Sequence, residues 1–397
     1  MTVVSDPFAP EFRADPSPSY RILRDAGRLH EYRPGIYLVP HYADCSAIFA
    51  DPAFGHGYFS GINPFRPGVD PRNLPGSFLL MDPPDHTRLR AMVAPAFTSR
   101  AIALLRDQIT DTAITLLDQA VAAGEIDFVA DIAYLLPLTT ICTILGIPRS
   151  DHATFGIWAS AISRGLDPDA LLSDNDKQAR ATAVLAFAEY FTDLIARRRA
   201  DPGTDLLSTL ATETPLEIKE LVDIAVLLLI AGHETTMNLI ATGVLAVARN
   251  PQQREILRAD PDSSRFAVEE FLRFDTPVPF PTRVAMQDIE LDGRTLPRGT
   301  GFILLAGSAH RDPAAFTDPD SLDITRFAPG RHTSRHLAFS HGPHFCIGAP
   351  LARLQAEILF TELMRRTPDF TLLNPTPPYR ESVSMRGPQS LPVRIPR

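Results

Sequence analysis

The chain has 397 residues, of which 45% are hydrophobic, and a formal net charge of −9 at pH 7. The hydrophobic content is enough for a large core, and the negative charge argues against nucleic acid as a partner. The three cysteines, Cys45, Cys142 and Cys346, contain no closely spaced pair and give no disulfide framework. Such sparse cysteines are typical of a reducing compartment.

The N-terminal residues carry no targeting signal. Met1–Pro7 lacks both the basic and the apolar part of a signal peptide. The longest apolar run, Ile224–Gly232, is too short to span a bilayer. We therefore expect a cytoplasmic protein with no membrane partner, in which residues 1–19 form a partly loosely ordered N-terminal extension.

The predicted elements are mostly helices, with a few short strands. Segments rich in Val, Ile and Leu predict strands at Ile36–Val39, Ile289–Leu291, Phe302–Leu305 and Leu391–Ile395. Residues 98–250 are rich in Ala and Leu and mostly helical in pattern. The elements do not follow the regular βαβ rhythm of a doubly wound fold. The sequence therefore predicts one mainly α domain with small β sheets, spanning residues 1–397.

Several basic residues stand at the ends of predicted elements. His86 and Arg90 are four residues apart at the start of a helix, Arg283 enters a strand, and His344 precedes Cys346 by two residues. Taken singly, each is more typical of a solvated surface charge.

One long helix is predicted in the middle of the chain. Thr214-Pro-Leu-Glu217 has the form of a capping box with Pro at the first helical position. The apolar pattern then continues to Asn250, where Pro251 stops it. This gives a helix of about 35 residues and roughly 50 Å, long enough to cross a domain.

Inside this helix lies the sequence Ala231-Gly-His-Glu-Thr-Thr236. Gly232 and the β-branched threonines are poor helix formers, so we expect a local distortion. The small Ala231 would let a flat cofactor lie against the helix. Glu234 and Thr235 can form a proton relay; the alternative is a polar stretch that faces a water-filled crevice.

Glu270 and Arg273 are three residues apart on a further helix. At an exposed site such a pair contributes only a few tenths of a kcal/mol, roughly. In a buried site the arginine can hold the carboxylate through two hydrogen bonds and tie it to another segment.

The ten residues Phe339 to Gly348, FSHGPHFCIG, place Cys346 in a loop bent by Gly and Pro, directly before a helical pattern. A thiolate there lies at a helix N-terminus, where free N–H groups favour negative charge. Phe339 can keep water from the sulfur, and Gly348 allows close approach of something flat. A single shielded sulfur suits a haem iron; a buried structural cysteine is the alternative. A zinc site has only His344 near Cys346.

These two motifs resemble those of the cytochrome P-450 superfamily of haem-thiolate monooxygenases. The spacing Phe-x-x-Gly-x-His-x-Cys-x-Gly is similar to the family's haem-binding loop, and Glu234-Thr235 to the acid–alcohol pair of its central helix. The family usually has Gly at the position of Ser340, and more commonly Asp at that of Glu234. The resemblance extends from about Tyr20 to Leu391.

The resemblance implies a cytochrome P-450 fold, a single triangular-prism domain, with heme b (iron protoporphyrin IX) as cofactor. It implies Glu234 and Thr235 as catalytic residues and Cys346 as the iron ligand. It further implies that Glu270, Arg273 and Arg326 form a buried structural cluster. The implied cofactor-binding residues are His86, Arg90, Arg283 and His344 at the propionates, with Ala231, Phe339, Cys346 and Gly348 around the ring.

From this resemblance we expect an oxidoreductase that activates dioxygen to hydroxylate or epoxidise a bulky small molecule. Secondary metabolites, such as polyketides and antibiotics, are the expected substrate class. The chain has no Gly-x-Gly-x-x-Gly fingerprint and no room for a flavin domain, so electrons should come from a separate ferredoxin with its ferredoxin reductase. We expect a monomer.

Two other functions remain open. The first is oxidation or aryl coupling of an aromatic or acyl substrate bound to a carrier protein. The second is a haem-binding sensor without oxygenase activity, against which Glu234 and Thr235 argue, because a passive binder needs no proton relay.

The resemblance also suggests which segments form the substrate pocket. The expected walls are His56–Phe78, Trp158–Leu172, Leu227–Ala231, Val278–Phe280 and Val383–Arg386. A basic patch for the ferredoxin is expected on the cysteine side, with Arg90, Arg100 and Arg353 as members.

Overall fold

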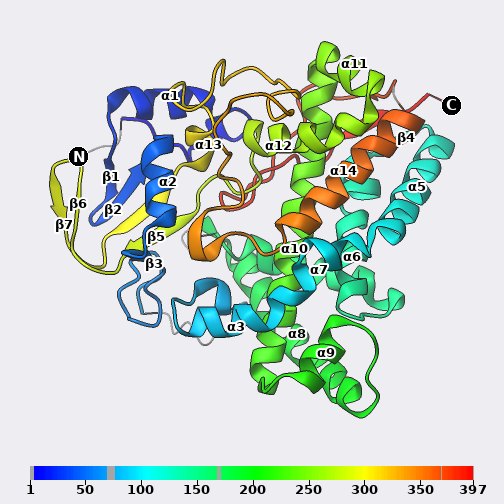
Figure 1. Ribbon diagram of the computed structural model, residues 1–397, viewed down its shortest axis with the longest axis horizontal. Coiled ribbons are helices and arrows are strands. Elements are labelled where there is room, and N and C mark those ends of the chain that lie inside the picture. Colours follow the sequence, from blue (N-terminus) through cyan, green and yellow to red (C-terminus); the bar gives the residue numbers. More distant parts are fainter. Residues whose placement is uncertain (1–3, 69–76, 168–170, 368, 397) are drawn as a thin grey trace.

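The computed structural model describes residues 4–68, 77–167, 171–367 and 369–396. Figure 1 shows the largest sheet at one side of the molecule and most of the helices at the other, with α10 (Ile218–Arg249) running through the middle. The prediction of a mainly α protein with small β sheets is confirmed.

Most of the chain between residues 98 and 250 is helical, as predicted. The α helices are α1 (Ser17–Ala26), α2 (Tyr42–Ala50), α3 (Asp85–Val93), α4 (Ser99–Ala103), α5 (Arg106–Ala123), α6 (Leu135–Ile144), α7 (His152–Arg164), α8 (Asp174–Ala200), α9 (Leu206–Glu213), α10, α11 (Pro251–Ala259), α12 (Ser264–Phe274), α13 (Ala306–Ala309) and α14 (Ala349–Arg366). Short 3-10 helices occupy Pro10–Phe12, Ser77–Leu80, Ala94–Phe97, Arg149–Asp151, Pro261–Ser263 and Gly342–His344, and a π-helical turn occupies Val129–Ala133.

The strands form three small sheets. The largest has the order β1 (His30–Arg33), β2 (Ile36–Val39), β8 (Gly301–Leu304), β5 (Thr282–Ala285) and β3 (Phe54–Gly55). Its β2–β8 pair is parallel and its other pairs are antiparallel. The others are β4 (Glu125–Asp127), β10 (Pro392–Arg394) and β9 (Thr371–Leu372), and the hairpin of β6 (Ile289–Leu291) and β7 (Arg294–Leu296). All four predicted strands are present, with ends shifted by at most one residue.

Helix α10 is buried along nearly its whole length, because its sequence is apolar on almost every side. Between residues 224 and 247, every residue is buried except Ala231, Gly232 and Thr235. By length and composition this helix could cross a membrane, but 83% of its most apolar 18-residue stretch is buried inside the protein. The core helix of a globular fold has the same properties.

The start of α10 differs from the prediction. The helix begins at Ile218, and its capping box is formed by Glu217 and Glu220. Thr214 instead follows the end of α9, where its hydroxyl donates to the carbonyl of Leu210 at 2.6 Å. Because it precedes Pro215, Thr214 is held in an extended conformation that a helix cannot include. The helix therefore has 32 residues.

The expected distortion at Gly232–Thr236 is also absent, since α10 is α-helical without a break from Ile218 to Arg249. The Thr235 hydroxyl donates to the Ala231 carbonyl one turn earlier, at 2.7 Å. That bond satisfies the hydroxyl within the helix itself. Packing on both sides then outweighs the weak helix propensity of these residues.

Close packing around α10 depends on a small residue at one crossing. Helix α10 packs against α12 and α14, whose Phe271 and Phe360 rings lie 4.7 Å apart. A Cβ on Gly243 would lie 2.6 Å from Phe360 and 2.9 Å from Phe271. Only glycine lets the three helices approach this closely.

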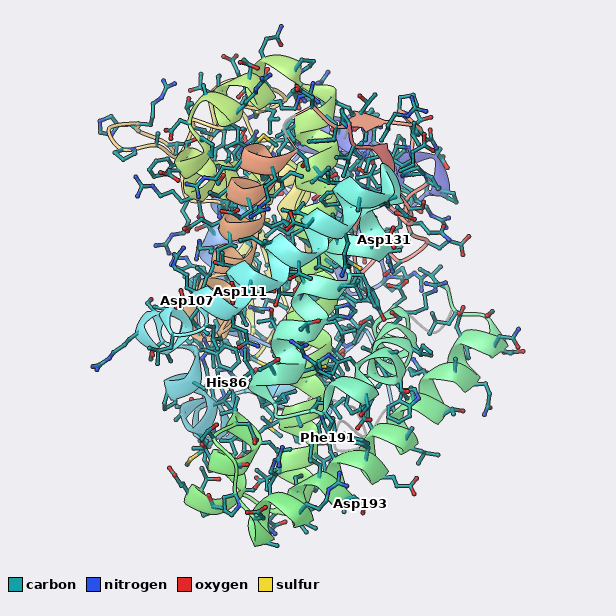
Figure 2. All side chains as sticks on the ribbon, turned by 90° about the vertical axis from the view of Figure 1, so that its right-hand side faces the viewer. His86, Asp107, Asp111, Asp131, Phe191 and Asp193 are labelled. Atoms are coloured by element: carbon teal, nitrogen blue, oxygen red, sulfur yellow. The ribbon has the colours of Figure 1, made fainter. Side chains whose placement is uncertain are left out.

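Helix α5, on which Figure 2 labels Asp107 and Asp111, packs on α14.

The described part of the N-terminal extension packs against the rest of the chain. The Phe8 ring lies 4.7 Å from that of Phe280 and 5.3 Å from that of Tyr32. Arg386 donates hydrogen bonds to the carbonyls of Arg13 and Ala14. These contacts join the first residues of the chain to its C-terminal segment.

A buried ion cluster ties α12 to the segment that precedes the cysteine loop. Arg273 donates to both oxygens of Glu270, at 2.7 and 2.8 Å, and Arg326 donates to the same carboxylate at 3.1 Å. The side chains of Glu270 and Arg273 are fully buried, and that of Arg326 is 8% exposed. The expected burial of this cluster is confirmed.

Replacing Glu270 by Gln should destabilise the protein strongly. The substitution leaves two buried guanidinium groups without their counter-charge, which costs about 3–5 kcal/mol. Urea unfolding followed by far-UV circular dichroism measures the free energy of unfolding. As a control, Arg365→Ala removes a half-exposed partner of Asp262 and should cost less than about 1 kcal/mol. Equal losses in the two variants would contradict a structural role for the cluster.

Candidate active site

The loop that carries Cys346 is closed by its own backbone. The Cys346 N–H donates to the carbonyl of Phe339 at 2.9 Å, and Gly342 has a φ of 71°. A Cβ on Gly342 would lie 2.6 Å from the carbonyl oxygen of Phe49. The loop can therefore pack on α2 only with glycine at this position. Cys346 is half-buried and lies three residues before Ala349, the first residue of α14.

Ser340 has a φ of 62°, in the left-handed region that favours glycine. This explains physically why the similar family usually has Gly at this position. In this chain the serine gains a contact, since its hydroxyl oxygen lies 3.2 Å from a guanidinium nitrogen of Arg283. The conformational cost is thus offset in part by a partner for a buried cation.

Opposing effects act on the Cys346 thiol. Burial raises its pKa, while the backbone N–H groups of Gly348 and Ala349 and the charges of Arg90 and Arg353 lower it, and the net shift is upward. A bound metal cation would reverse this balance, because coordination deprotonates a thiol. Phe339 is 9% exposed, and its ring lies 6.4 Å from that of Phe345 in the same loop.

Four of the basic residues singled out in the sequence are placed around this loop. His86 is 3% exposed on α3, and its ring lies 4.1 Å from that of His344. Arg90, one turn further along α3, donates to the carbonyl of Phe345 at 2.6 Å. Arg283 is 5% exposed on β5 and also donates to the Thr282 carbonyl. Residues from three distant parts of the sequence thus converge.

The two arginines of this cluster, Arg90 and Arg283, are cations without a paired carboxylate in the part of the chain that the structure describes. Burial lowers the pKa of Arg283 to about 10 and that of His344 to about 3, with Arg283 and His86 adding to the latter shift. Burial and Arg90 also lower the pKa of His86. Among the described residues, no carboxylate forms an ion pair with Arg90 or Arg283, and the Nδ1 atom of His86 has no partner. The donor set fits a cofactor with negatively charged groups.

The only break in the burial of α10 between residues 224 and 247 is one helical turn. Ala231 is exposed and Gly232 and Thr235 are half-buried, so the open positions are i, i+1 and i+4 on one face. Helix α6 closes the side-chain direction of Gly232, since a Cβ on this residue would lie 3.1 Å from Ile141. A flat group can lie along this open face, because its small residues let the group approach the helix backbone.

Glu234 faces the protein interior rather than this open turn. It is 3% exposed, and its Oε1 atom has no hydrogen-bond partner. Burial raises the pKa of this carboxyl, while the charge of Arg380 and contacts with Ser160 and Ser163 lower it, and the net shift is upward. Burial also lowers the pKa of the adjacent His233 to about 4, so that imidazole is neutral at pH 7.

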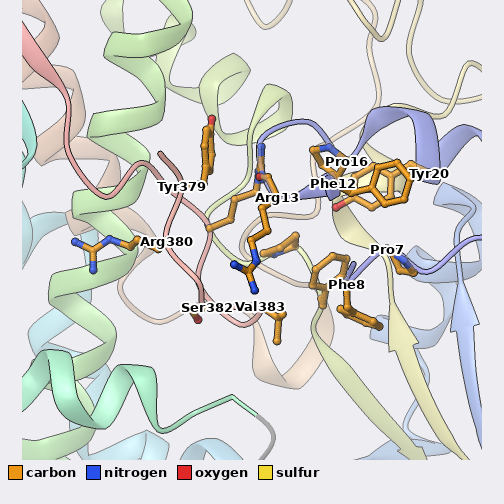
Figure 3. Close-up of a pocket in the computed structure, with 13 residues that line it drawn as sticks. Pro7, Phe8, Phe12, Arg13, Pro16, Tyr20, Tyr379, Arg380, Ser382 and Val383 are labelled. Carbon is orange, nitrogen blue, oxygen red and sulfur yellow. The ribbon is translucent and has the colours of Figure 1, made fainter. Parts of the chain in front are cut away.

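Arg380 is a neighbour of this acid that sequence spacing could not predict, because it comes from the C-terminal segment. Its Nη2 atom lies 3.6 Å from the sulfur of Met237, three residues after Glu234, and its Nε atom is buried without a partner. Figure 3 shows the Arg380 guanidinium pointing toward α10, away from the other residues of the cleft that it helps to line.

The cleft is lined by Pro279, Phe280, Val383 and Arg386, which belong to two of the segments expected to form the substrate pocket. Residues of the N-terminal region, among them Phe8, Phe12 and Tyr20, line its other part (Figure 3). Within the expected wall 56–78, residues 69–76 lie outside the described residues, and so do residues 168–170 of Trp158–Leu172. Trp158 packs on the Phe187 ring of α8, at 5.2 Å.

Two of the three expected members of the basic patch on the cysteine side have partners within the protein. Arg353 donates to both oxygens of Glu269, at 2.6 and 2.8 Å, so its charge is neutralised. Arg90 is half-buried and bound to the Phe345 carbonyl, whereas Arg100 is exposed. Glu269 also accepts a hydrogen bond from His336 at 3.0 Å. Sequence spacing could not reveal these partners, which come from different elements.

Glu269 should make the stability of the protein depend on pH in the acidic range. Burial alone raises the pKa of Glu269, but hydrogen bonds from Arg353 and His336 outweigh it and bring the pKa from 4.5 to about 2. Because the folded-state pKa is the lower one, this stabilisation is complete above about pH 4.5 and is lost as the pH falls toward 2. Glu269→Gln should therefore cost about 3 kcal/mol at pH 7 and almost nothing at pH 2.

Urea unfolding at a series of pH values tests this dependence. Glu125→Gln, which removes an exposed partner of Arg394, is the matched control and should cost less than about 1 kcal/mol. A Glu269→Gln variant with the same loss of stability at pH 3 and pH 7 would refute the role of this carboxylate.

Comparisons with known proteins identify the family. A model of the family described as cytochrome P-450 matches residues 171–372. The chain is 38% identical to the cytochrome P-450 monooxygenase PikC of Streptomyces venezuelae, over 97% of this chain and 92% of that protein. It is 37% identical to the vitamin D(3) 25-hydroxylase of Pseudonocardia autotrophica, over 98% of this chain and 96% of that protein.

Solved structures agree with these sequence comparisons. The cytochrome P-450 PksS of the bacillaene polyketide synthase of Bacillus subtilis 168 superposes with a TM-score of 0.88 at 34% identity, covering 99% of this chain and all of the other. P-450 BioI, solved with an acyl carrier protein ligated to hexadec-9Z-enoic acid, gives a TM-score of 0.87 at 33% identity, covering 97% and 99%. The chain belongs to the cytochrome P-450 family and has its fold. It is a monooxygenase of the haem-thiolate class.

Proposed function

We propose that Cys346 binds the iron of heme b as a thiolate and that this site inserts an oxygen atom from dioxygen into an organic substrate. The observation that carries the proposal is a half-buried thiol shortly before α14, beside the buried Arg283 and the half-buried Arg90, neither of which forms an ion pair among the described residues. When bound, the haem supplies the activation of dioxygen, which thiolate ligation favours.

The residues around the thiol have separate roles in binding the cofactor. His86, Arg90, Arg283 and His344 would bind its two propionates, since a neutral imidazole and a guanidinium both donate hydrogen bonds to carboxylates. Phe339 excludes water from the sulfur, Gly348 lets the backbone lie close to the ring, and Ala231 forms part of the flat seat on α10. The support is geometric, because the ideal Cβ of Gly348 has only the Cys346 sulfur within 4 Å.

Glu234 and Thr235 are the proposed catalytic pair. The Thr235 hydroxyl lies on the open turn of α10 and donates to the Ala231 carbonyl. Release of that hydrogen bond would let the same O–H donate to a group bound in the site. The raised pKa of Glu234 keeps that carboxyl a proton donor nearer to neutral pH than an ordinary glutamate. Arg380 and the serines of α7 face the acid from its other side.

The proposed substrate is a bulky secondary metabolite, hydroxylated or epoxidised at one position. Similarity to PikC and to PksS of a polyketide synthase supports a polyketide or related antibiotic precursor. Electrons would come from a separate ferredoxin and ferredoxin reductase, since the sequence contains no dinucleotide-binding fingerprint. We place this reaction in the cytoplasm, in a monomer.

A substrate bound to a carrier protein is the second candidate. P-450 BioI, one of the similar structures, was solved with a ligated acyl carrier protein. Optical titration of the haem with one acyl or aryl group, offered free and then attached to a carrier protein, separates the two cases. Tighter binding of the attached form would favour the second candidate, and equal binding would favour the first.

Cys346 should give the ferrous carbon monoxide adduct the red-shifted Soret band of thiolate ligation. Cys346→His should abolish this band while haem remains bound. Cys142→Ser, which alters a buried thiol far from the loop in sequence, should leave the band in place. A wild-type spectrum like that of a histidine-ligated globin would contradict the proposed function.

Thr235→Ala should separate electron use from product formation. Consumption of NAD(P)H should continue while hydrogen peroxide accumulates, because the hydroxyl that directs proton delivery is lost. Product formed per NAD(P)H should fall on the order of 10²-fold, the lower end of the effect of a positioned proton donor. Thr236→Ser, at the adjacent buried position, is the control. Unchanged coupling in Thr235→Ala would mean that another group runs the relay.

A further inference from the structure

His56 is a third imidazole beside the two histidines already described. It follows β3 directly and is 8% exposed. Its ring lies 4.5 Å from the His344 ring in an edge-to-face arrangement, and the His344 ring lies 4.1 Å from that of His86. Three imidazoles from three segments of the chain therefore lie in series inside the protein.

The backbone on both sides of His56 is fixed by one carboxylate. The N–H groups of His56 and Gly57 donate to the two oxygens of Asp82, at 2.8 and 2.9 Å. The Asn63 amide donates to the His56 carbonyl at 2.6 Å. A Cβ on Gly55 would lie 2.4 Å from the Asp82 carboxylate, so this arrangement needs glycine before the histidine. The backbone that carries the imidazole is thereby held in one place.

The Nε2 atom of His56 is buried and has no partner among the described residues. A buried polar atom without a partner costs about 1–3 kcal/mol unless a ligand or ordered water satisfies it. The groups facing the ring are basic: burial lowers the pKa of His56 well below its usual value, and Arg283, His344 and His86 lower it further. Asp82, the nearby carboxylate, is already bound to backbone N–H groups.

We propose that the Nε2–H of His56 donates a hydrogen bond to a carboxylate of the bound porphyrin, as a further cofactor-positioning residue. The proposal rests on the proposed cofactor site. Neutral His56 supplies a donor without adding a third positive charge beside Arg90 and Arg283. An anionic acceptor accounts both for the orphaned nitrogen and for the excess of basic groups around it.

Two variants separate the hydrogen bond from the packing of the ring. His56→Phe keeps a flat ring against His344 and removes the donor, whereas His56→Gln keeps an N–H donor near the position of Nε2. Haem transfer to an excess of apomyoglobin measures retention of the cofactor. We expect transfer from His56→Phe to be roughly tenfold faster, equivalent to about 1.4 kcal/mol, and transfer from His56→Gln to stay close to that of the unaltered protein. His152→Phe, at a half-buried histidine that opens α7, is the control.

The carbon monoxide spectrum of each holoprotein separates this inference from the proposed function. Absence of the thiolate band from the unaltered protein would overturn the proposed function itself. With the band intact in all variants, unchanged haem transfer from His56→Phe would overturn the hydrogen bond. Equally fast transfer from His56→Phe and His56→Gln would also overturn it, because the N–H donor kept in His56→Gln would then not retain the cofactor. A shift of the propionate bending modes in the resonance Raman spectrum of His56→Phe alone would support it.

Discussion

The burial of α10 is the constraint on which the rest of the structure depends. A helix satisfies its own backbone hydrogen bonds, so it can cross an apolar core without leaving polar groups unpaired. Along this helix, packing against α6, α7, α8, α12 and α14 is interrupted at a single turn. The interruption at Ala231, Gly232 and Thr235 is therefore a defined opening in the core, bordered by apolar packing above and below. Thr235 lies at this opening, whereas the adjacent Glu234 faces the protein interior.

The opposite side of the site depends on two consecutive carboxylates of α12. Successive helix residues point about 100° apart, so Glu269 and Glu270 reach different segments. Glu270 binds Arg326, before the cysteine loop, whereas Glu269 binds His336 just before the loop and Arg353 just after it. The loop is thus held at both ends by buried or half-buried charges. The position of the Cys346 sulfur therefore depends on these ion pairs together with the backbone hydrogen bond from Cys346 to Phe339.

How far the sequence predicts this site depends on how far apart along the chain the interacting residues lie. Cys346, Glu234 and Thr235 stand out because local spacing and helical periodicity encode them. The capping box could not be assigned in this way, because both Thr214 and Glu217 precede a suitable partner. Thr214 is excluded because it ends α9 in an extended conformation, which leaves Glu217 to begin α10. From the sequence, Arg353 is expected in a basic patch and its partner cannot be identified, because Glu269 lies 84 residues away. His56 joins the basic cluster only because β3 pairs with β5 and brings its loop toward Arg283.

The net charge around Cys346 depends on which of these basic groups carry a positive charge. Burial and the neighbouring arginines push the pKa of His56, His86 and His344 downward, so at pH 7 these rings are neutral donors. Arg283, even with its pKa lowered to about 10, stays charged, as does Arg90. Two positive charges, the buried Arg283 and the half-buried Arg90, thus match in number the two carboxylates of the proposed cofactor. Burial of these cations opposes folding because it removes them from water. Binding of an anion that neutralises their charge therefore also stabilises the folded protein.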